Sequence, residues 1–147
     1  MICDLTTSIF DSKAECLVNA VNCEGIMGRG IALEFKARFP DNFRIYADLC
    51  KSWIVKPGSI VSVTHPNMSV RIINAATKDR WMMPSELRWA QQCVLAIRDE
   101  VGLRGIKSIA IPALGCGLGG LRWQDVRPML IKAFEYVDCH VELYGPQ

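Results

Sequence analysis

Residues 108–121 read SIAIPALGCGLGGL, an apolar run that leads into a glycine-rich segment. Its first five residues form a short apolar run, which predicts a buried strand over Ser108–Pro112. Four glycines follow within residues 115–120, which predicts a loop. Beyond the loop, we expect a helix over residues 123–136. Apolar residues at helical spacing indicate its core-facing side, namely Val126, Leu130, Ala133, Phe134 and, just after the helix, Val137. A strand, a glycine-rich loop and a helix in this order are typical of α/β folds.

A second unit of the same kind lies near the N-terminus, where residues 15–30 read ECLVNAVNCEGIMGRG. We expect a strand over residues 15–22, a loop holding three glycines, and then a helix that Pro40 ends at the residue before it. Ligands of open α/β sheets bind beyond the carboxyl ends of the strands. Glycine lets backbone N–H groups approach an anion closely, so two such loops could clamp a diphosphate. The alternative is that the glycines only make tight turns.

The remaining pattern completes an alternation of strands and helices. We expect strands over residues 1–5, 59–64, 70–75 and 139–144, and helices over residues 42–51 and 85–101. The helix over residues 85–101 should end at Gly102. Its core-facing residues should be Leu87, Ala90, Val94, Leu95, Ile97 and Val101. The sequence therefore predicts an α/β fold, a three-layer α/β/α sandwich with a mixed, largely parallel sheet, in one domain over residues 1–147.

Composition narrows the class of protein. The chain has 147 residues, half of them hydrophobic, and a net charge of +2, which is too weak to indicate nucleic-acid binding by itself. No apolar run is long enough to span a bilayer. The seven cysteines contain no C-x-x-C pair and only two histidines accompany them, so we expect reduced structural thiols and neither a metal nor a cofactor. We expect a monomer in the cytoplasm, or in the nucleus of a eukaryote.

Three stretches resemble the macro domain family: residues 17–23 (LVNAVNC), 28–36 (GRGIALEFK) and 111–121 (IPALGCGLGGL). Within that family, the motif over residues 22–32 and Thr77-Lys78 are most similar to the branch of the DNA ADP-ribosyl glycohydrolase antitoxins and the terminal ADP-ribose protein glycohydrolase. The resemblance implies a macro fold, ADP-ribose in the cleft, and removal of ADP-ribose from a nucleic-acid base, a carboxylate or a related group. Nucleic acid, and DNA in particular, is the expected substrate.

The resemblance also implies the residues of the site. Carried over by position, the ADP-ribose contacts are Ser8, Ile9, Asn19, Asn22, Gly25, Met27, Gly28, Gly30, Ile31, Thr77, Pro112, Leu114, Gly115, Cys116, Gly117, Leu118, Gly119, Gly120 and Leu121. Asn22 would face the distal ribose. Ser8 stands where many macro domains place an aspartate that binds adenine, which implies weaker or different adenine recognition. Gly119 stands where the protein-directed relative has an aspartate, which favours the nucleic-acid branch.

Lys78, together with Asn22, is the expected catalytic residue. A neutral amine could attack the anomeric carbon or the opened sugar, or act as a base. Either role requires a lowered pKa, from burial or from a nearby cation such as Arg80. Glu24 could help to position water. Cys23 and Cys116 lack a histidine partner in the sequence, so we interpret them as packing residues.

Arg80 and Trp81 are tentative nucleic-acid contacts, because aromatic side chains stack on unpaired bases and arginine binds phosphates. Trp89 could join them or could belong to the core of its helix, and Trp53 and Trp123 are expected to be structural. Other functions remain open: a phosphatase acting on ADP-ribose 1″-phosphate, a hydrolase of O-acyl-ADP-ribose or of ADP-ribosylated glutamate in proteins, and a reader that binds ADP-ribose without turnover.

Overall fold

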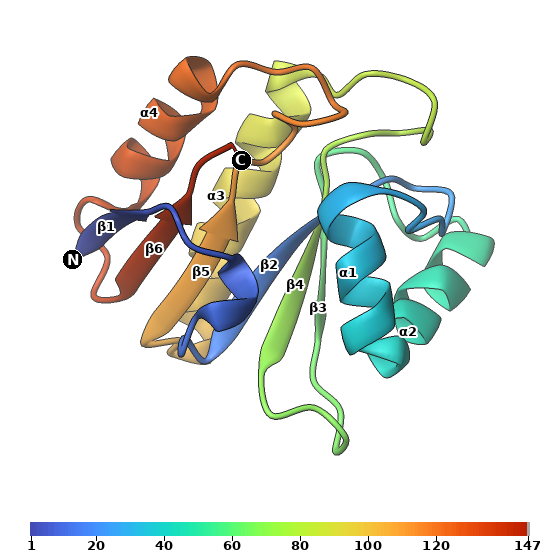
Figure 1. The fold of residues 1–147 in the computed structure, drawn as a ribbon, viewed down its shortest axis with the longest axis horizontal. Helices are drawn as coiled ribbons and strands as arrows, with labels where there is room; N and C mark the ends of the chain where they lie inside the picture. The colour runs from blue at the N-terminus through green and yellow to red at the C-terminus, as the bar shows by residue number, and fades with distance from the viewer. Residues whose placement is uncertain (147) are drawn as a thin grey trace.

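The computed structural model describes residues 1–146, and its centre is a six-stranded sheet in the order β1-β6-β5-β2-β4-β3 (Figure 1). The strands are β1 (Ile2–Leu5), β2 (Cys16–Val21), β3 (Ile60–Val63), β4 (Arg71–Ala76), β5 (Ser108–Pro112) and β6 (His140–Tyr144). Every neighbouring pair is parallel except β3 and β4, which are antiparallel. The prediction of a mixed, largely parallel sheet is confirmed.

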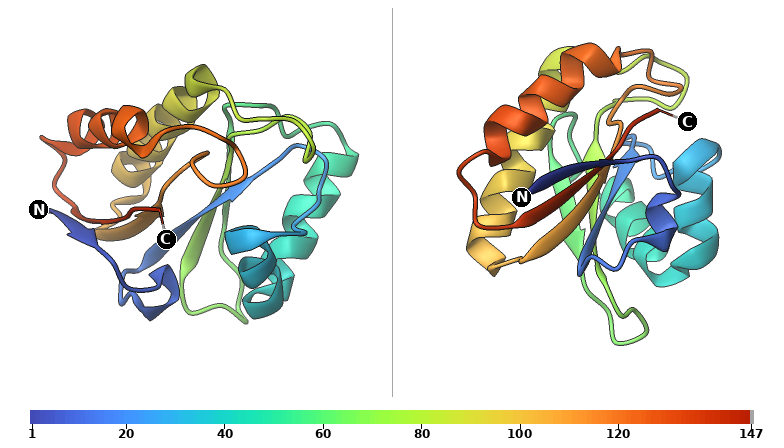
Figure 2. Two further views of the ribbon diagram at one scale, coloured as in Figure 1. Left: turned by 45° about the horizontal axis from the view of Figure 1, so that its top comes forward. Right: turned by 60° about the vertical axis from the view of Figure 1, so that its left-hand side comes forward.

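Helices cover both faces of the sheet, which confirms the three-layer sandwich (Figures 1 and 2). One layer holds α1 (Gly30–Arg38), α2 (Pro40–Lys51) and the short 3-10 helix η1 (Ile9–Asp11). The other layer holds α3 (Leu87–Arg104) and α4 (Trp123–Phe134). The 3-10 helix η1 was not predicted from the sequence. Its N-cap is Ser8, whose side chain accepts a hydrogen bond from the backbone N–H of Phe10 at 3.2 Å.

Two apolar clusters, one on each face of the sheet, form the core. Successive residues of a strand point to opposite faces, so the neighbours Ile72 and Ile73 of β4 enter different clusters. Ile73 packs with Ile97 of α3, whereas Ile72 packs with Phe35 of α1. All four side chains are fully buried, and each contributes about 1.5–3 kcal/mol of transfer free energy. A central strand buried on both faces is therefore mostly apolar, and the buried Asn74 of β4 is an exception whose side chain is hydrogen-bonded.

The helices end where the local sequence favours an end, and one predicted boundary has to be corrected. Phe39 caps α1 and leads directly into α2, because Pro40 cannot continue the first helix but suits the first turn of the second. The prediction that Gly102 ends α3 was wrong. The helix continues to Arg104 and ends at Gly105, which takes the left-handed conformation at φ +63° that a C-terminal cap favours.

The predicted core stripe of α3 also needs correction. Leu87 and Leu95 are each 39% exposed, and Cys93 is buried in their place. The buried residues of α3 are Ala90, Cys93, Val94, Ile97 and Val101. These positions follow a spacing of three and four residues, and cysteine fits the stripe because it behaves as a small hydrophobe.

Trp53 was expected to be structural, and the structure contradicts this. The residue follows α2 with its side chain 80% exposed and its backbone in the left-handed region at φ +60°. Its N–H donates to the Cys50 carbonyl oxygen at 3.0 Å, and the next N–H, of Ile54, donates to the Leu49 carbonyl oxygen at 3.2 Å. This is a Schellman cap with a tryptophan at the position where glycine is usual. Trp123, by contrast, packs against the core as expected.

Replacing Trp53 with glycine should stabilise the protein, since glycine adopts positive φ without steric cost. We expect Trp53→Gly to raise the free energy of unfolding by about 0.5–1 kcal/mol, measured by urea denaturation. Trp53→Ala is the matched control, because alanine removes the indole but keeps the Cβ that causes the strain. An equal gain in both variants would show that the exposed indole, and not the backbone conformation, is responsible.

Candidate functional site

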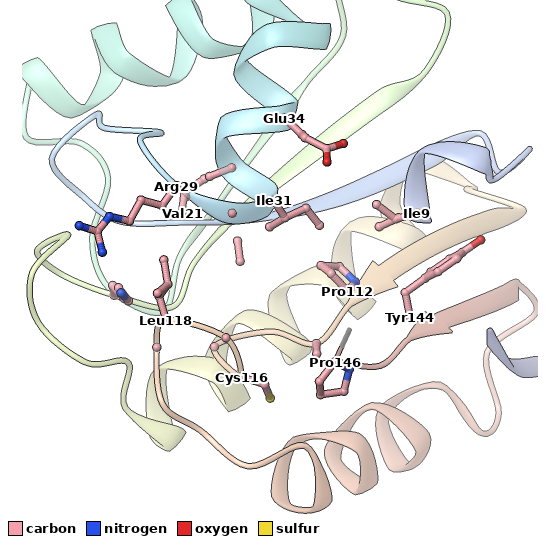
Figure 3. Close-up of a pocket in the computed structure, with 18 of the residues that line it drawn as sticks. Ile9, Val21, Arg29, Ile31, Glu34, Pro112, Cys116, Leu118, Tyr144 and Pro146 are labelled. Atoms are coloured by element: carbon pink, nitrogen blue, oxygen red, sulfur yellow. The ribbon is translucent and has the colours of Figure 1, made fainter. Parts of the chain in front are cut away.

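A cleft of about 990 Å³ opens at the carboxyl ends of the central strands (Figure 3). Both glycine loops line it: the first (residues 22–30) between β2 and α1, and the second (residues 113–122) between β5 and α4. Because α1 begins at Gly30, the N-terminus of that helix borders the cleft. Backbone N–H groups at a helix N-terminus and in glycine-rich loops favour anions, so the middle of the cleft suits a diphosphate.

Most of the predicted site residues line this cleft. They are Ser8, Ile9, Asn22, Gly28, Gly30, Ile31, Lys78, Trp81, Pro112, Gly115, Cys116, Gly117, Leu118 and Gly119. The structure does not bring Asn19, Gly25, Met27, Thr77, Leu114, Gly120 and Leu121 to the cleft surface. Asn19, Met27, Thr77 and Leu114 are buried instead, as supports behind the loops. Arg80 also lies outside the cleft, in a separate recess.

The first loop is organised by Asn22. Its side-chain amide donates to the Ile26 carbonyl oxygen at 2.8 Å, and its side-chain oxygen accepts from the Glu24 N–H at 2.9 Å. The buried Tyr46 hydroxyl donates to Asn22 as well, at 2.7 Å to the backbone oxygen. Gly25, at φ +82°, faces α2 so closely that a Cβ would touch its backbone. Asn22 therefore holds the shape of the loop, whatever it contributes to a ligand.

Behind the first loop, three buried asparagines form a network. Asn74 exchanges side-chain hydrogen bonds with Asn42 at 2.8 and 3.1 Å, and its oxygen also accepts from Asn19 at 3.3 Å. The Asn19 amide contacts the sulfur of Met27 at 3.7 Å, which ties the network to the loop. Asn19 was predicted to bind ligand, but it is fully buried and supports Met27 from below. The network satisfies the side chains of Asn42 and Asn74, whereas the side-chain oxygen of Asn19 is buried without a hydrogen-bond partner among the described residues.

The second loop is tightly folded around Gly115 and Gly119. Gly115 has φ +73°, and its carbonyl oxygen accepts from the Leu121 N–H at 2.9 Å. A Cβ on Gly119 would lie 2.5 Å from that same oxygen and closer still to the Ser85 hydroxyl. An aspartate at this position therefore does not fit the loop as it is folded. Gly117 has open space around it and faces the cleft.

The segment between β4 and α3, residues 77–86, is termed the bridging segment here because it bonds to both loops. The Cys23 N–H donates to the Asp79 carbonyl oxygen at 2.9 Å, and the Trp81 N–H donates to the Glu24 carboxylate at 2.8 Å. At the other end, the Ser85 N–H donates to the Gly119 carbonyl oxygen at 3.0 Å. Glu24 was expected to position water in the cleft. It does not line the cleft, and its carboxylate fixes the bridging segment instead.

Lys78 lies at the start of the bridging segment, half-buried in the wall of the cleft. Its Nζ donates to the Trp81 carbonyl oxygen at 3.4 Å. Burial, and secondly the positive charge of Arg29, lower the pKa of Lys78 below its usual value. A lowered pKa was predicted, but the neighbouring cation was expected to be Arg80. Within residues 1–146, neither Lys78 nor Arg29 forms a salt bridge, so the like charges act on each other without a carboxylate between them.

The two ends of the cleft differ in character. Arg29 and Leu118 lie at one end, and Ile9, Pro112 and Tyr144 lie together toward the other (Figure 3). Lining residues that the sequence analysis missed are Phe10, Ala20, Val21, Ile26, Arg29, Ala32, Glu34, Ala113, Tyr144, Gly145 and Pro146. A signal existed for Arg29, which stands between two glycines of the first loop. No local pattern marks Tyr144, because it reaches the cleft only through the pairing of β6 with β5.

The thiols in the loops are poor nucleophiles. Burial raises the pKa of Cys23 to about 12 and that of Cys116 to about 11. Both remain protonated near neutral pH and act as small packing residues. No group of three or more His, Cys, Asp or Glu side chains in residues 1–146 could hold a metal ion. No helix in that range has the length and apolar character needed to cross a membrane.

Comparison with known proteins gives the family. The family model of the macro domain matches residues 18–130. The DNA ADP-ribosyl glycohydrolase of Mycobacterium tuberculosis is 39% identical over 138 residues, which are 92% of this chain and 39% of the relative. The corresponding protein of Thermus aquaticus is 35% identical over 142 residues, again 39% of its length. The chain thus spans well under half the length of these curated relatives.

Solved structures agree with the sequence comparison. The macrodomain of Mycobacterium tuberculosis DarG superposes with a TM-score of 0.96 at 37% identity, covering 100% of this chain and 99% of that one. Thermosipho africanus DarTG in complex with ADP-ribose gives 0.93 at 29% identity, covering 99% of this chain and 41% of that one. The resemblance inferred from the glycine-loop motifs is confirmed. The chain belongs to the macro domain family, and its sequence is similar to the DNA ADP-ribosyl glycohydrolases.

Proposed function

We propose that this chain binds ADP-ribose in the cleft and hydrolyses the bond between ADP-ribose and a nucleic-acid base, with DNA as the substrate. The observation that carries the proposal is Lys78, an amine of lowered pKa in the wall of a cleft formed by two glycine loops. The names of the Mycobacterium tuberculosis and Thermus aquaticus relatives support this substrate. The bound ADP-ribose of the Thermosipho africanus structure supports the ligand.

The two ends of the cleft suggest how ADP-ribose lies in it. The diphosphate would lie in the middle, between the glycine loops, where backbone N–H groups and the N-terminus of α1 favour negative charge. The adenine would lie at the other end, beside Ile9 and Tyr144, where Glu34 also borders the cleft and Ser8 stands in place of the aspartate of many macro domains (Figure 3). The distal ribose would then meet Lys78 and Arg29. This orientation places the anomeric carbon, where the modified base is attached, at the only reactive amine lining the described part of the cleft.

Lys78 could act by either of two routes, and both require the neutral amine. As a nucleophile, its nitrogen forms a bond to C1″ while the base departs with the bonding electrons, and water later replaces the lysine. As a base, it takes a proton from the water that attacks C1″. Burial and the Arg29 charge raise the neutral fraction of the amine near neutral pH. A reader without turnover would have no need for this environment.

The substrate must come from a reaction that attaches ADP-ribose to nucleic acid. The relative from Thermosipho africanus, 30% identical over 155 residues, is described as a fusion of a DNA ADP-ribosyl transferase with a DNA ADP-ribosyl glycohydrolase. A DNA ADP-ribosyl transferase is accordingly the proposed partner activity. The present chain would reverse the modification that such an enzyme makes.

Replacing Lys78 should separate turnover from binding. We expect Lys78→Ala to abolish release of ADP-ribose from modified single-stranded DNA, followed by HPLC, while ADP-ribose affinity by calorimetry changes by less than about tenfold. Lys78→Arg should be equally inactive, because arginine keeps the charge but cannot become neutral. ADP-ribosylated glutamate in a protein and ADP-ribose 1″-phosphate serve as parallel substrates. If Lys78 is needed for turnover of one of these two substrates and modified DNA is not cleaved, the protein has that other activity and the proposed one is wrong.

Arg29 should set the pH range of the reaction. If the neutral amine reacts, kcat/KM rises with pH as Lys78 loses its proton. Removing the neighbouring charge stabilises the ammonium form, so in Arg29→Gln the pKa of Lys78 rises and the acid limb of the profile moves to higher pH. Arg29→Lys, which keeps the charge, should leave the limb near its wild-type position. If the acid limb of the profile lies at the same pH in wild type and both variants, the pH dependence does not arise from the interaction of Arg29 with Lys78.

Gly119→Asp should not convert the protein to the protein-directed activity. The new side chain collides with Ser85 and the Gly115 carbonyl oxygen, so we expect a loss of about 1–3 kcal/mol in the free energy of unfolding, and no gain of activity on ADP-ribosylated glutamate. Gly117→Ala is the control for stability, because its Cβ meets open space. A stable Gly119→Asp variant that cleaves the glutamate ester would contradict the steric argument.

A further inference from the structure

A second recess, of about 500 Å³, is lined in part by the bridging segment, which also carries Lys78. Its lining comes from the bridging segment and the start of α3: Asp79, Arg80, Met83, Pro84, Glu86 and Trp89. The bridging segment thus serves two cavities, because Lys78 and Trp81 line the cleft whereas Asp79 and Arg80 line the recess. Residues next to each other in the chain therefore line the cleft and the recess.

The recess combines an apolar wall with two charged side chains that form no salt bridge within residues 1–146, Arg80 and Asp79. Met83, Pro84 and the indole of Trp89 provide the apolar surface. Glu86 is neutralised by Arg88, at 3.0 Å, and the Arg88 guanidinium lies 5.5 Å from the centre of the Trp89 ring. Arg80 is exposed and has no salt-bridge partner within residues 1–146, so its charge faces solvent.

The rim between the cleft and the recess is unusually apolar for an exposed loop. Trp81 is 43% exposed, Met82 is 75% exposed and Met83 is 54% exposed. Their backbone is not free to fold inward, because the Trp81 N–H bonds to Glu24 and the Met83 N–H donates to the Arg80 carbonyl oxygen at 3.0 Å. The structure thus holds large apolar side chains in solvent beside the reactive lysine. Exposed apolar clusters of this kind mark interaction sites.

We propose that the recess binds an unmodified nucleotide next to the ADP-ribosylated one in a single strand of nucleic acid. This inference rests on the proposed function and adds the part of the substrate beyond the modified base. The base of the neighbouring nucleotide stacks on the Trp89 and Met83 wall, and Arg80 contacts a phosphate. Base stacking on aromatic side chains with arginine on the backbone is the common mode of single-strand binding.

Charge complementarity distinguishes a polynucleotide from other occupants. Arg29 and Lys78 line the cleft, Arg80 lines the recess, and none of these cations has a salt-bridge partner within the described residues, so we infer that the ligand follows a path along them, with Asp79 as the one carboxylate of the recess that no cation pairs there. A polynucleotide carries one negative charge per residue and matches such a path. The strand has to be single, because a paired base could neither enter the cleft with its ADP-ribose nor stack on Trp89.

The test compares a minimal substrate with an extended one. The minimal substrate is an ADP-ribosylated nucleoside, and the extended one is a single-stranded oligonucleotide that carries the same modified base. We expect wild type to favour the oligonucleotide by on the order of tenfold in kcat/KM, since stacking of a single base gives an effect of this size. Arg80→Ala and Met83→Glu should remove most of that preference while turnover of the nucleoside stays at the wild-type level.

The control variant is Arg104→Ala, which removes an exposed arginine from the last turn of α3 and should keep the preference. Equal kcat/KM for both substrates in wild type, or an equal loss on both in the two recess variants, would overturn the inference but leave the proposed function intact. A preference for ADP-ribosylated peptides over the modified amino acid, removed by the same variants, would assign the recess to peptide and would also overturn it.

A binding measurement separates failure of the recess from failure of the proposed function. Fluorescence anisotropy with an unmodified single-stranded oligonucleotide should show salt-dependent binding that Arg80→Ala weakens and Arg104→Ala does not. If wild type cleaves neither substrate but this binding is present, the recess is supported and the hydrolase is wrong. If cleavage and binding are both absent, both proposals are wrong.

Discussion

The parallel pairing of β2 with β4 on one side and β5 on the other is the constraint on which the site depends. Val21, the last residue of β2, lies opposite Ala76, the last residue of β4, so Asn22 and Thr77 leave the sheet side by side. Since β5 runs in the same direction, its loop emerges at the same edge. Slipping one strand by a single residue would turn its buried side chains to the opposite face. Core packing thus fixes where the first loop, Lys78 and the second loop lie.

The bridging segment connects the two glycine loops through hydrogen bonds. Without it, the two glycine loops would face each other across the cleft with no direct link. The backbone hydrogen bonds from Cys23 and Ser85, and the bond from Trp81 to Glu24, join the segment to both loops. The lysine is therefore positioned by the elements that would hold the diphosphate, and its distance from the distal ribose follows from that geometry. Prearranged groups of this kind reduce the ordering that binding and reaction require.

Much of the fold could be read from the sequence, because the relevant signals are local. β5 was predicted at its observed bounds, since a short apolar run is closed by Pro112 and by a glycine-rich loop. The end of α3 was misplaced because glycine can occur inside a helix, as Gly102 does, and only the backbone conformation of Gly105 shows which glycine is the cap. Trp53 was misjudged because a tryptophan at a left-handed cap has no marker in the sequence.

The site could be predicted in outline but not in its electrostatics. The glycine loops and Lys78 follow from motifs, whereas the charge that acts on Lys78 depends on which strands are neighbours. Arg80 is two residues away in the chain, yet its side chain lies in the recess, and Arg29 reaches Lys78 because β2 pairs with β4. Likewise, Asn19 looked like a ligand contact from its place in the motif. Its position along β2 turns its side chain into the asparagine network instead.

The bridging segment also has a consequence for how such proteins diverge. Its backbone groups are hydrogen-bonded to the two loops, but the side chains of Met82 and Met83 are largely exposed and do not line the cleft. Substitutions at these two positions can therefore accumulate without disturbing Lys78 or the glycine loops. Under the proposed function, such substitutions would change which molecule carries the ADP-ribose while the cleft stays the same, and a single scaffold would acquire new substrates through a few surface residues.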